Sequence, residues 1–383
     1  MIKDNLLKKF EQLENGFLEI KLPSKKNLQF GNPNSEIKAD IEIRDMRLID
    51  LVIAKGDIGL GQGYIESMFE SSDLASLLYF FTINQKQVEN LFYGKRLFSI
   101  FFSLKNMLRY NNLKGSKKNI SHHYDLGNDF YSLWLDPSMT YSSGIFQNCD
   151  SLDESQKQKY QRIINQLNPT GRQVLEIGCG WGGFMEEGSK SGLDVLGLTL
   201  SQEQLHFSQN RMRKQNFKSQ AVLKDYRHEA GKFDNIVSIE MFEAVGKEYW
   251  NSYFSQIKSC LKDSGKAVVQ TITIDEDAYH KYEKTSDFIR EFIFPGGFLP
   301  TKSEFEKIAQ DNNLQVADKF EFGQCYDKTL AIWLKNFDAA KEKIIYLGFD
   351  ESFIRKWRFY LAYCMAGFRG QRIDVVQYSL THI

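Results

Sequence analysis

One glycine-rich stretch governs the fold of this chain: Val174-Leu175-Glu176-Ile177-Gly178-Cys179-Gly180-Trp181-Gly182-Gly183. An apolar strand runs here into a glycine-rich turn, and the turn runs into a helix that begins near Phe184. Glycines let the backbone turn tightly and approach a ligand closely, and the N-terminus of a helix offers free N–H donors. The stretch therefore predicts a cradle for a nucleotide-containing cofactor.

The glycine spacing alone fits two classes of cofactor. Gly178, Gly180 and Gly183 satisfy the G-x-G-x-x-G pattern of dinucleotide-dependent dehydrogenases. Those enzymes hold the ribose through a carboxylate about 20 residues further on, at the tip of the second strand. The second strand expected here, 194–199, has no acid at its tip.

Acids at other positions favour S-adenosylmethionine (SAM). Glu176 lies inside the first strand, and Asp225-Tyr226 follow a third strand expected near 219–223. A fourth strand, 233–239, leads into Glu240-Met241-Phe242-Glu243. SAM is therefore the favoured cofactor, and a nicotinamide dinucleotide is the alternative.

Strand and helix patterns alternate from about residue 120 onward, which predicts a doubly wound parallel sheet. Strands are expected at 173–177, 194–199, 219–223, 233–239 and 266–272, with a hairpin-like pair at 315–322 and 328–334 closing the sheet. The long insertion at 274–302 is expected to form a lid or a substrate wall. The fold class predicted is α/β, a Rossmann-like doubly wound sheet with a smaller amino-terminal α+β domain.

The chain is expected to divide into three parts: an amino-terminal domain at 1–94, a basic linker at 95–121 and a catalytic domain at 122–383. Between Lys95 and Lys118 the sequence has seven basic residues, no acid and many bulky apolar residues. A basic amphipathic helix suits an anionic membrane surface, where each basic residue contributes about 1 kcal/mol. The alternative is a linker helix packed on the main domain by its apolar face.

Composition excludes several classes of protein. Lys plus Arg and Asp plus Glu number 49 each, which argues against a dedicated nucleic-acid binder. The five cysteines are scattered and form no C-x-x-C pair, as is typical of a reduced, cytoplasmic protein without a zinc site. His122 and His123 suggest a metal, but no third ligand follows at a recognisable spacing, so no metal is expected. The apolar runs are too short to span a bilayer, and a peripheral protein is expected.

Several motifs together resemble the cyclopropane-fatty-acyl-phospholipid synthase family, whose relatives include the mycolic acid cyclopropane synthases and methyltransferases. The matching segments are His123-Tyr124-Asp125 through Phe130, Tyr141-Ser142, Leu175 through Gly183, Thr199-Leu200-Ser201 with Gln204, Glu240–Gly246, Ile293–Pro300 and Phe322–Leu330. The stretch Gly56–Gly63 looks like the amino-terminal domain of the bacterial phospholipid enzymes, so the resemblance covers nearly the whole chain. It implies that the doubly wound sheet is a SAM-methyltransferase domain.

The resemblance also implies a set of SAM-binding residues. The expected contacts are Tyr141, Ser142, Glu176, Gly178, Gly180, Thr199, Leu200, Gln204, Asp225 and Tyr226. The two glycines are expected at the methionine end, Thr199 and Gln204 at the ribose, and Asp225 and Tyr226 at the adenine. A Thr/Gln pair would thus replace the carboxylate missing after the second strand.

Relatives in this family are thought to use bicarbonate as a base, held by a Cys, a Glu, a His, a Tyr and a backbone group. The corresponding catalytic positions here are Ser143, Glu243, Gln270, Tyr326 and Ile272. Serine in place of cysteine is a mild change. Glutamine can donate a hydrogen bond but cannot carry charge or accept a proton, so the site either binds the anion weakly or uses Glu243 directly as the base.

The activity expected is SAM-dependent C-methylation of the double bond of unsaturated acyl chains in membrane phospholipids, forming a cyclopropane at the cytoplasmic membrane face. The altered base site makes a methyl-branched alkene a second candidate product, and a saturated branch would require a partner reductase. Two rival functions are an N-methyltransferase of small amines and a catalytically silent lipid-binding protein. Relatives favour a homodimer.

Overall fold

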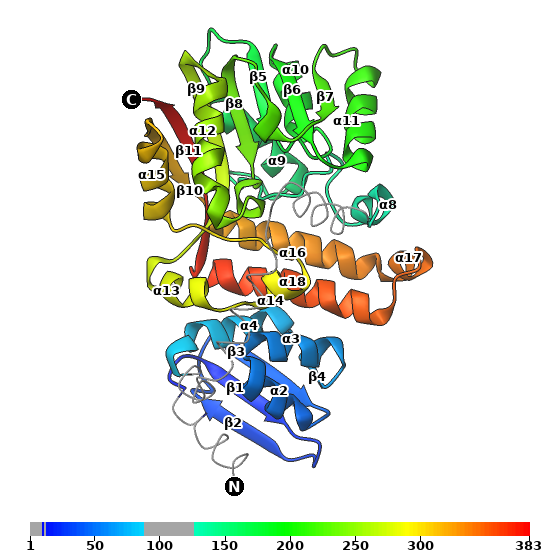
Figure 1. Cartoon of the computed structure of the whole chain (residues 1–383). Coiled ribbons are helices and arrows are strands. Elements are labelled where there is room, and N and C mark those ends of the chain that lie inside the picture. The colour runs from blue at the N-terminus through cyan, green and yellow to red at the C-terminus, as the bar shows by residue number, and fades with distance from the viewer. Residues whose placement is uncertain (1–9, 11–12, 88–125) are drawn as a thin grey trace. The chain divides into compact units, whose positions relative to one another are not determined.

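The computed structural model describes residues 10, 13–87 and 126–383, which form two compact units (Figure 1). One unit combines the described part of Met1–Leu108 with His280–Ile293 and Trp333–Arg372. The other combines the described part of Arg109–Tyr279 with Phe294–Ile332 and Ile373–Ile383. We call them the four-stranded unit and the seven-stranded unit after their sheets.

The sheet of the seven-stranded unit has the strand order β10-β11-β9-β8-β5-β6-β7. Its strands are β5 Gln173–Ile177, β6 Asp194–Thr199, β7 Gln220–Leu223, β8 Phe233–Ile239, β9 Leu261–Ile274, β10 Leu314–Glu321 and β11 Ile373–His382. Strands β5 to β9 pair in parallel, whereas β11 is antiparallel to both of its neighbours. The predicted doubly wound α/β fold is therefore confirmed.

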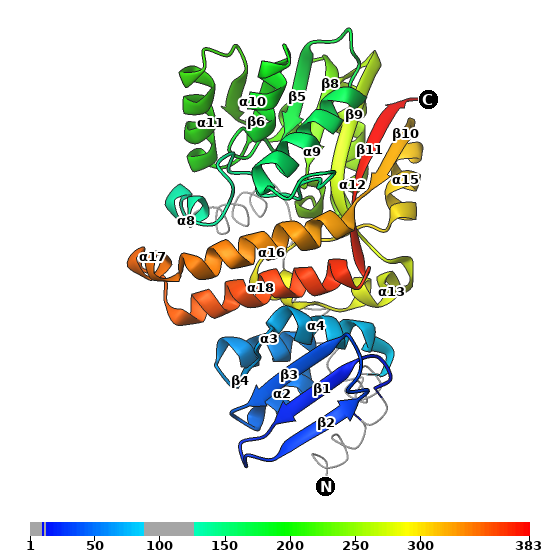
Figure 2. The same cartoon turned by 180° about the vertical axis from the view of Figure 1, so that it is seen from behind.

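Helices cover both faces of this sheet. One face carries α9 Leu152–Gln166, α10 Gly183–Lys190 and α11 Gln202–Lys214, and the other carries α12 Trp250–Cys260 and α15 Lys302–Asp311 (Figures 1 and 2). Successive residues of a strand point to opposite faces, so Val174 packs in the core under α9 to α11 and Leu175 in the core under α12 and α15. Short elements complete the unit: α8 Asn128–Ser132 and the 3₁₀ turns η2 Tyr226–His228, η3 Phe242–Ala244 and η4 Lys247–Tyr249.

One predicted strand is wrong. Residues 328–334 lie inside helix α16 Gly323–Ala339, and the antiparallel partner of β9 and β10 is instead β11, which the sequence analysis missed. The buried side chains of α16 are spaced three or four residues apart: Tyr326, Leu330, Trp333 and Phe337. This spacing lines one face of a helix, and a short apolar window within it cannot be told from a buried strand.

The four-stranded unit is an α+β fold, as predicted, with the strand order β2-β1-β3-β4. Its strands are β1 Phe17–Lys21, β2 Asn27–Gly31, β3 Lys38–Ile43 and β4 Phe69–Glu70. Its helices are α2 Arg47–Lys55, α3 Asp57–Ile65, α4 Leu74–Ile83, α14 Phe288–Phe292, α17 Lys341–Tyr346 and α18 Glu351–Arg369, and α13 Glu276–Lys284 continues into it.

Arg355 of α18 joins the carboxy-terminal helix to the amino-terminal residues. Its guanidinium donates to the carbonyl oxygens of Tyr64 and Phe69 over 2.5 and 3.1 Å, and to Glu70 over 2.8 Å. It also stacks 4.0 Å from the centre of the Tyr64 ring. These acceptors offset the cost of burying the guanidinium, so α18 is an integral part of the four-stranded unit.

The contacts do not follow a single cut in the chain. Residues 280–293 and 333–372, which the predicted catalytic domain 122–383 includes, pack with the amino-terminal residues. The predicted boundaries near 94 and 121, the basic linker 95–121 and the pair His122-His123 lie outside the described residues. Within the described residues, no helix is long and apolar enough to cross a bilayer, and no three His, Cys, Asp or Glu side chains are grouped to hold a metal ion.

Candidate active site

The glycine turn after β5 forms one wall of a pocket. Gly178 has φ +83°, and a Cβ at this position would lie 2.8 Å from the Cγ of Met241, so no other residue fits. Gly180 has φ +51°, and no atom of the described residues lies within 4 Å of where its Cβ would be, so these residues leave its backbone open to a ligand. The amides of Gly178 and Cys179 both donate to the Leu198 carbonyl, which fixes the turn against β6.

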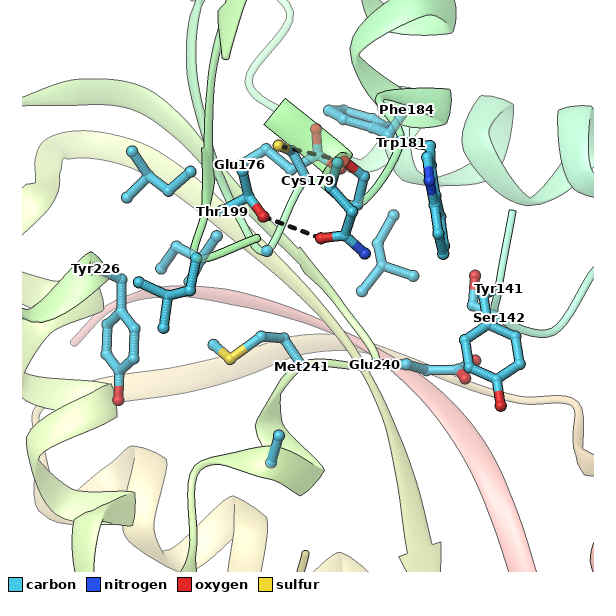
Figure 3. Close-up of a pocket in the computed structure, with 18 of the residues that line it drawn as sticks. Tyr141, Ser142, Glu176, Cys179, Trp181, Phe184, Thr199, Tyr226, Glu240 and Met241 are labelled. Carbon is cyan, nitrogen blue, oxygen red and sulfur yellow. Dashed lines mark hydrogen bonds between the residues drawn. The ribbon is translucent and has the colours of Figure 1, made fainter. Parts of the chain in front are cut away.

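All ten predicted SAM-binding residues line this one pocket: Tyr141, Ser142, Glu176, Gly178, Gly180, Thr199, Leu200, Gln204, Asp225 and Tyr226. Figure 3 shows Tyr226 at one end of the pocket and Tyr141 and Trp181 at the other. The side chain of Glu240, which no prediction included, lies on the side of Tyr141 and Ser142. Both ends of the pocket therefore have aromatic side chains, and the end with Tyr141 also has the carboxylate of Glu240.

The pair predicted to bind the ribose is preorganised. The Thr199 hydroxyl donates to Gln204 Oε1 over 2.9 Å, so the N–H groups of the Gln204 amide remain to donate within the pocket. The Ser201 hydroxyl caps α11 by accepting from the backbone nitrogen of Gln204, which fixes where the helix begins. Hydroxyl and amide groups of this kind can bind a diol without a carboxylate.

Asp225 is less available than the sequence suggested. Its carboxylate accepts hydrogen bonds from the backbone nitrogen and the guanidinium of Arg227. Burial raises the pKa of Asp225, but these bonds outweigh it and hold the pKa below its usual value. Arg227 also lines the pocket and was not predicted. Asp225 therefore acts in this pocket as an ionised partner of Arg227.

Glu176 provides an acceptor that fits a cation. It is 2% exposed, and its Oε2 has no hydrogen-bond partner among the described residues. Burial raises its pKa to about 8, although the charge of Lys159 opposes the rise. A buried carboxyl group without a partner is costly unless a ligand supplies a donor. The ammonium group of SAM is such a donor, and the residues present fit this cofactor.

Helix α9 supports the Tyr141-Ser142 segment from behind. Gln156 donates to the Ser142 carbonyl oxygen over 2.9 Å, and Lys159 Nζ donates to the Ser142 hydroxyl over 2.5 Å. Lys159 is fully buried, and burial lowers its pKa to about 7. The position of Ser142 in the pocket is thus fixed by two side chains from one helix.

A second cluster of polar groups surrounds Glu240. Its Oε1 accepts from the Ser143 amide over 2.9 Å and from Gln270 Nε2 over 2.7 Å. Its Oε2 accepts from the Tyr326 hydroxyl over 2.5 Å. Burial raises the pKa of Glu240, and the hydrogen bonds from Tyr326 and Ser143 oppose that rise. Three of the groups predicted to hold bicarbonate therefore hold the carboxylate of Glu240.

Glu243 lies one turn further along, in η3. Its Oε1 accepts from the backbone nitrogen of Ile272, and its Oε2 is buried without a partner among the described residues. Burial and the nearby charge of Glu240 raise its pKa to about 8. Burial therefore favours the protonated form of Glu243, whereas the three donors at Glu240 favour its ionised form against the effect of burial.

The five predicted catalytic residues thus divide between two carboxyl groups. Ser143, Gln270 and Tyr326 contact Glu240, whereas Ile272 contacts Glu243.

The comparisons with known proteins agree with this geometry. A model of the mycolic acid cyclopropane synthetase family matches residues 111–378. The chain belongs to this family. Its members are SAM-dependent methyltransferases, and the chain is an enzyme of that class that binds SAM.

Two relatives show how far the similarity to this cyclopropane synthetase family extends. The cyclopropane-fatty-acyl-phospholipid synthase of Escherichia coli (strain K12) is 32% identical over 360 residues, which are 90% of this chain and 88% of that protein. The tuberculostearic acid methyltransferase UfaA1 of Mycobacterium tuberculosis is 34% identical over 277 residues, which are 69% of this chain. That match covers 65% of UfaA1, just under two thirds of its length.

Solved structures of other methyltransferases have the same fold as this chain. Mycolic acid cyclopropane synthase CmaA1, in complex with SAH and CTAB, has a TM-score of 0.64 at 31% identity and covers 69% of this chain and 97% of its own. Coclaurine N-methyltransferase has a TM-score of 0.66 and covers 85% of this chain and 99% of its own, but at 19% identity it shows only the fold.

Two polar residues of the candidate site, Glu240 and Lys159, were not among the predicted site residues. Glu240 stands three residues before Glu243, and this spacing was a signal that two carboxyl groups meet at the pocket. Lys159 occupies the same face of α9 as the buried Gln156 and Ile163, three to four residues apart. A lysine on a buried helix face needs a partner, and this signal pointed to a polar site.

Proposed function

We propose that this enzyme methylates the double bond of unsaturated fatty acyl chains in membrane phospholipids and forms a cyclopropane. The observation that carries the proposal is the buried carboxylate of Glu240 on the wall of the predicted SAM pocket. The similarity to the E. coli synthase, over 90% of this chain, supports phospholipid as the substrate class.

The chemistry of an alkene explains why a carboxylate is needed there. SAM supplies an electrophilic methyl group when it is bound. An alkene is a poor nucleophile, and its methylation leaves a positive charge on the lipid chain. A cation in a water-poor site is costly unless an anionic or aromatic group faces it. Glu240 supplies the anion, and Tyr141 supplies an aromatic ring on the same side of the pocket.

A second product has its own support. The relative UfaA1 is named as a tuberculostearic acid methyltransferase and not as a cyclopropane synthase. Loss of a proton from a neighbouring chain carbon, instead of from the added methyl group, gives a methyl-branched alkene. A saturated branch additionally requires hydride from a partner reductase. The same pocket and the same substrate serve both outcomes.

We propose that the enzyme works as a peripheral protein at the cytoplasmic face of the membrane. The seven basic residues between Lys95 and Lys118 support this location, because they complement anionic lipid headgroups. A homodimer stays an expectation. An amine N-methyltransferase shares the fold of this chain, but its identity of 19% gives no support for that function here.

Methyl-labelled SAM and vesicles of monounsaturated phospholipid test the proposal. Fatty acids from the reaction are separated by gas chromatography, which resolves a cyclopropane from a methyl-branched alkene of equal mass, and identified by mass spectrometry. A labelled cyclopropane is the expected product. A labelled branched alkene would favour the second product, and a protein that binds SAM but labels no lipid would contradict the proposed substrate.

A further inference from the structure

We infer that Glu240 is a built-in base that takes the place of a diffusible anion such as bicarbonate, and that Gln270, Gln377 and Arg162 position it. This inference rests on the proposed function. It assigns the proton acceptor of the reaction to a residue of the chain, and it predicts turnover without added bicarbonate.

The Glu240 carboxylate has hydrogen-bond donors on both of its oxygens. An ionised carboxylate has about four lone-pair positions on its two oxygens. Ser143 and Gln270 occupy two on Oε1, and Tyr326 occupies one on Oε2. The three donors stabilise the ionised form and leave one position on Oε2 for a proton. A separate anion would need the same donors, which Glu240 already uses.

Glu240 and Glu243 differ in their access to the pocket. Glu240 lines the predicted SAM pocket, whereas Glu243 is not among the described residues that line it. The Oε1 of Glu243 accepts from the Ile272 backbone nitrogen, and burial together with the charge of Glu240 favours the protonated form of Glu243. Of the two carboxyl groups, Glu240 is therefore the one that lines the pocket and has three donors that stabilise its ionised form.

A chain of hydrogen-bonded side chains lies behind Glu240. Gln377 of β11 donates to Gln270 Oε1 over 2.9 Å, so the Gln270 amide must turn its N–H group toward Glu240. Arg162 of α9 donates to Gln377 Oε1 over 2.9 Å and forms an ion pair with Asp318. Gln270 and Gln377 are both fully buried. This chain fixes the orientation of an amide that alone could point either way.

The backbone at Glu240 adds an independent observation. Glu240 has φ +50°, a left-handed conformation that glycine adopts readily and glutamate does not. Its amide donates to the Gln270 carbonyl over 2.8 Å, so the strained conformation is locked against β9. Strain of this kind persists where the surroundings hold it, and here it directs a carboxylate into a pocket.

The proton-transfer step balances on these groups. After methylation the lipid chain carries the positive charge on the second carbon of the former double bond. A C–H bond of the added methyl group breaks, its electron pair forms the third C–C bond of the ring, and its proton goes to Glu240 Oε2. Glu240 ends as a neutral acid, and it returns the proton to water before the next turnover. No oxidant or reductant is consumed.

The experiment compares the wild-type enzyme with Glu240→Gln and Glu240→Gly in buffer depleted of carbon dioxide, with and without added bicarbonate. Labelled lipid product is measured by the same chromatography and mass spectrometry, and SAM affinity is measured by calorimetry. The wild type is expected to turn over equally in both buffers. Glu240→Gln should lose about a hundredfold or more in rate under both conditions, because its amide fills the site but cannot accept a proton.

Glu240→Gly is the informative variant. Glycine suits φ +50°, so the variant should fold, and it empties the site between Ser143, Gln270 and Tyr326. We expect it to lose activity in depleted buffer and to recover at least tenfold when bicarbonate is added. Exposed Glu248→Gln is the matched control and should behave as the wild type.

The outcomes separate this inference from the proposed function. A wild type that labels lipid only with bicarbonate, or a Glu240→Gln variant at the wild-type rate with normal SAM affinity, overturns the role of Glu240 alone. A wild type that binds SAM and labels no lipid in either buffer overturns the proposed substrate, and the inference falls with it.

Discussion

Lys159 Nζ donates to the Ser142 hydroxyl over 2.5 Å from a side chain that is fully buried. An ammonium group thus lies directly behind a residue of the predicted SAM pocket. Burial lowers its pKa to about 7, although the charges of Glu240, Asp136 and Glu176 oppose this. The enzyme therefore keeps a lysine that is close to losing its proton at neutral pH.

The stability of the protein should reveal this lysine. In the unfolded chain its pKa returns to about 10.4. Between about pH 7 and pH 10 the unfolded chain therefore binds one proton more than the folded chain, and the free energy of unfolding rises with pH by about 1.4 kcal/mol per unit. Lys159→Met should remove this slope, as measured by urea unfolding at about pH 8.5 and about pH 9.5.

Below about pH 8, Glu176 and Glu243 change the free energy of unfolding in the opposite direction to Lys159. Their pKa values of about 8 make stability fall as pH rises toward 8, and this effect is largely complete above it. The exposed neighbour Lys157→Met is the control and should keep the wild-type slope. Parallel curves for the wild type and Lys159→Met would show that Lys159 titrates normally.

Glu176 should couple SAM binding to proton release. Its pKa of about 8 means that most of it is protonated near pH 7, and a cation bound beside it favours the ionised form. Calorimetry in two buffers of different ionisation enthalpy should show release of a proton when the wild type binds SAM. Glu176→Gln should abolish this release and weaken SAM binding at least tenfold.

The control for this variant is Glu187→Gln on the outer side of α10, where Glu187 pairs with Lys190. It should bind SAM as the wild type does. Equal proton release by Glu176→Gln and the wild type would assign the released proton to another group.

Much of the fold could be predicted because local sequence determined it. Strands β5, β6 and β8 were predicted at the observed residues, since each is a short apolar run bounded by turns or polar residues. Helix α16 and strand β11 could not be assigned in this way. The pairing of β11 depends on contacts between residues far apart in the chain, such as Gln377 opposite Gln270 in β9. A short apolar segment does not indicate which distant residues it will pair with.

The residues of the candidate site also differ in whether local sequence or tertiary contacts determine their position. Residues predicted to bind the cofactor through a local motif, such as Gly178 and Thr199, all line one pocket. The shared partner of Ser143, Gln270 and Tyr326 was not predicted, because these residues are brought together only by the tertiary structure. A prediction of ligand groups for an anion could not reveal that the chain supplies its own carboxylate.

Gln377→Met tests the side chains that position Glu240. Methionine has a similar volume but no amide, so Gln270 Oε1 loses its donor in a fully buried place. We expect a loss of about 1–3 kcal/mol in the free energy of unfolding. We also expect kcat to fall about tenfold at a temperature well below unfolding, with KM for SAM unchanged.

A double-variant cycle separates positioning from loss of stability. If Gln377 acts through Gln270, then Gln270→Met with Gln377→Met should lower kcat no more than Gln270→Met does. Independent, multiplicative losses would mean that Gln377 contributes only to packing.

Tyr326→Phe should change the pH dependence of the rate more than its maximum. The Tyr326 hydroxyl donates to Glu240 Oε2 over 2.5 Å, and a hydrogen bond to a carboxylate favours its ionised form. Removing it should raise the pKa of Glu240 and move the low-pH limb of the kcat profile upward by about one pH unit. The rate near pH 6 should therefore fall much more than the rate near pH 9. Tyr346→Phe, at a side chain that is 92% exposed, is the control. A profile that only scales downward, with its limb unmoved, would show that the hydroxyl does not set the ionisation of the catalytic base.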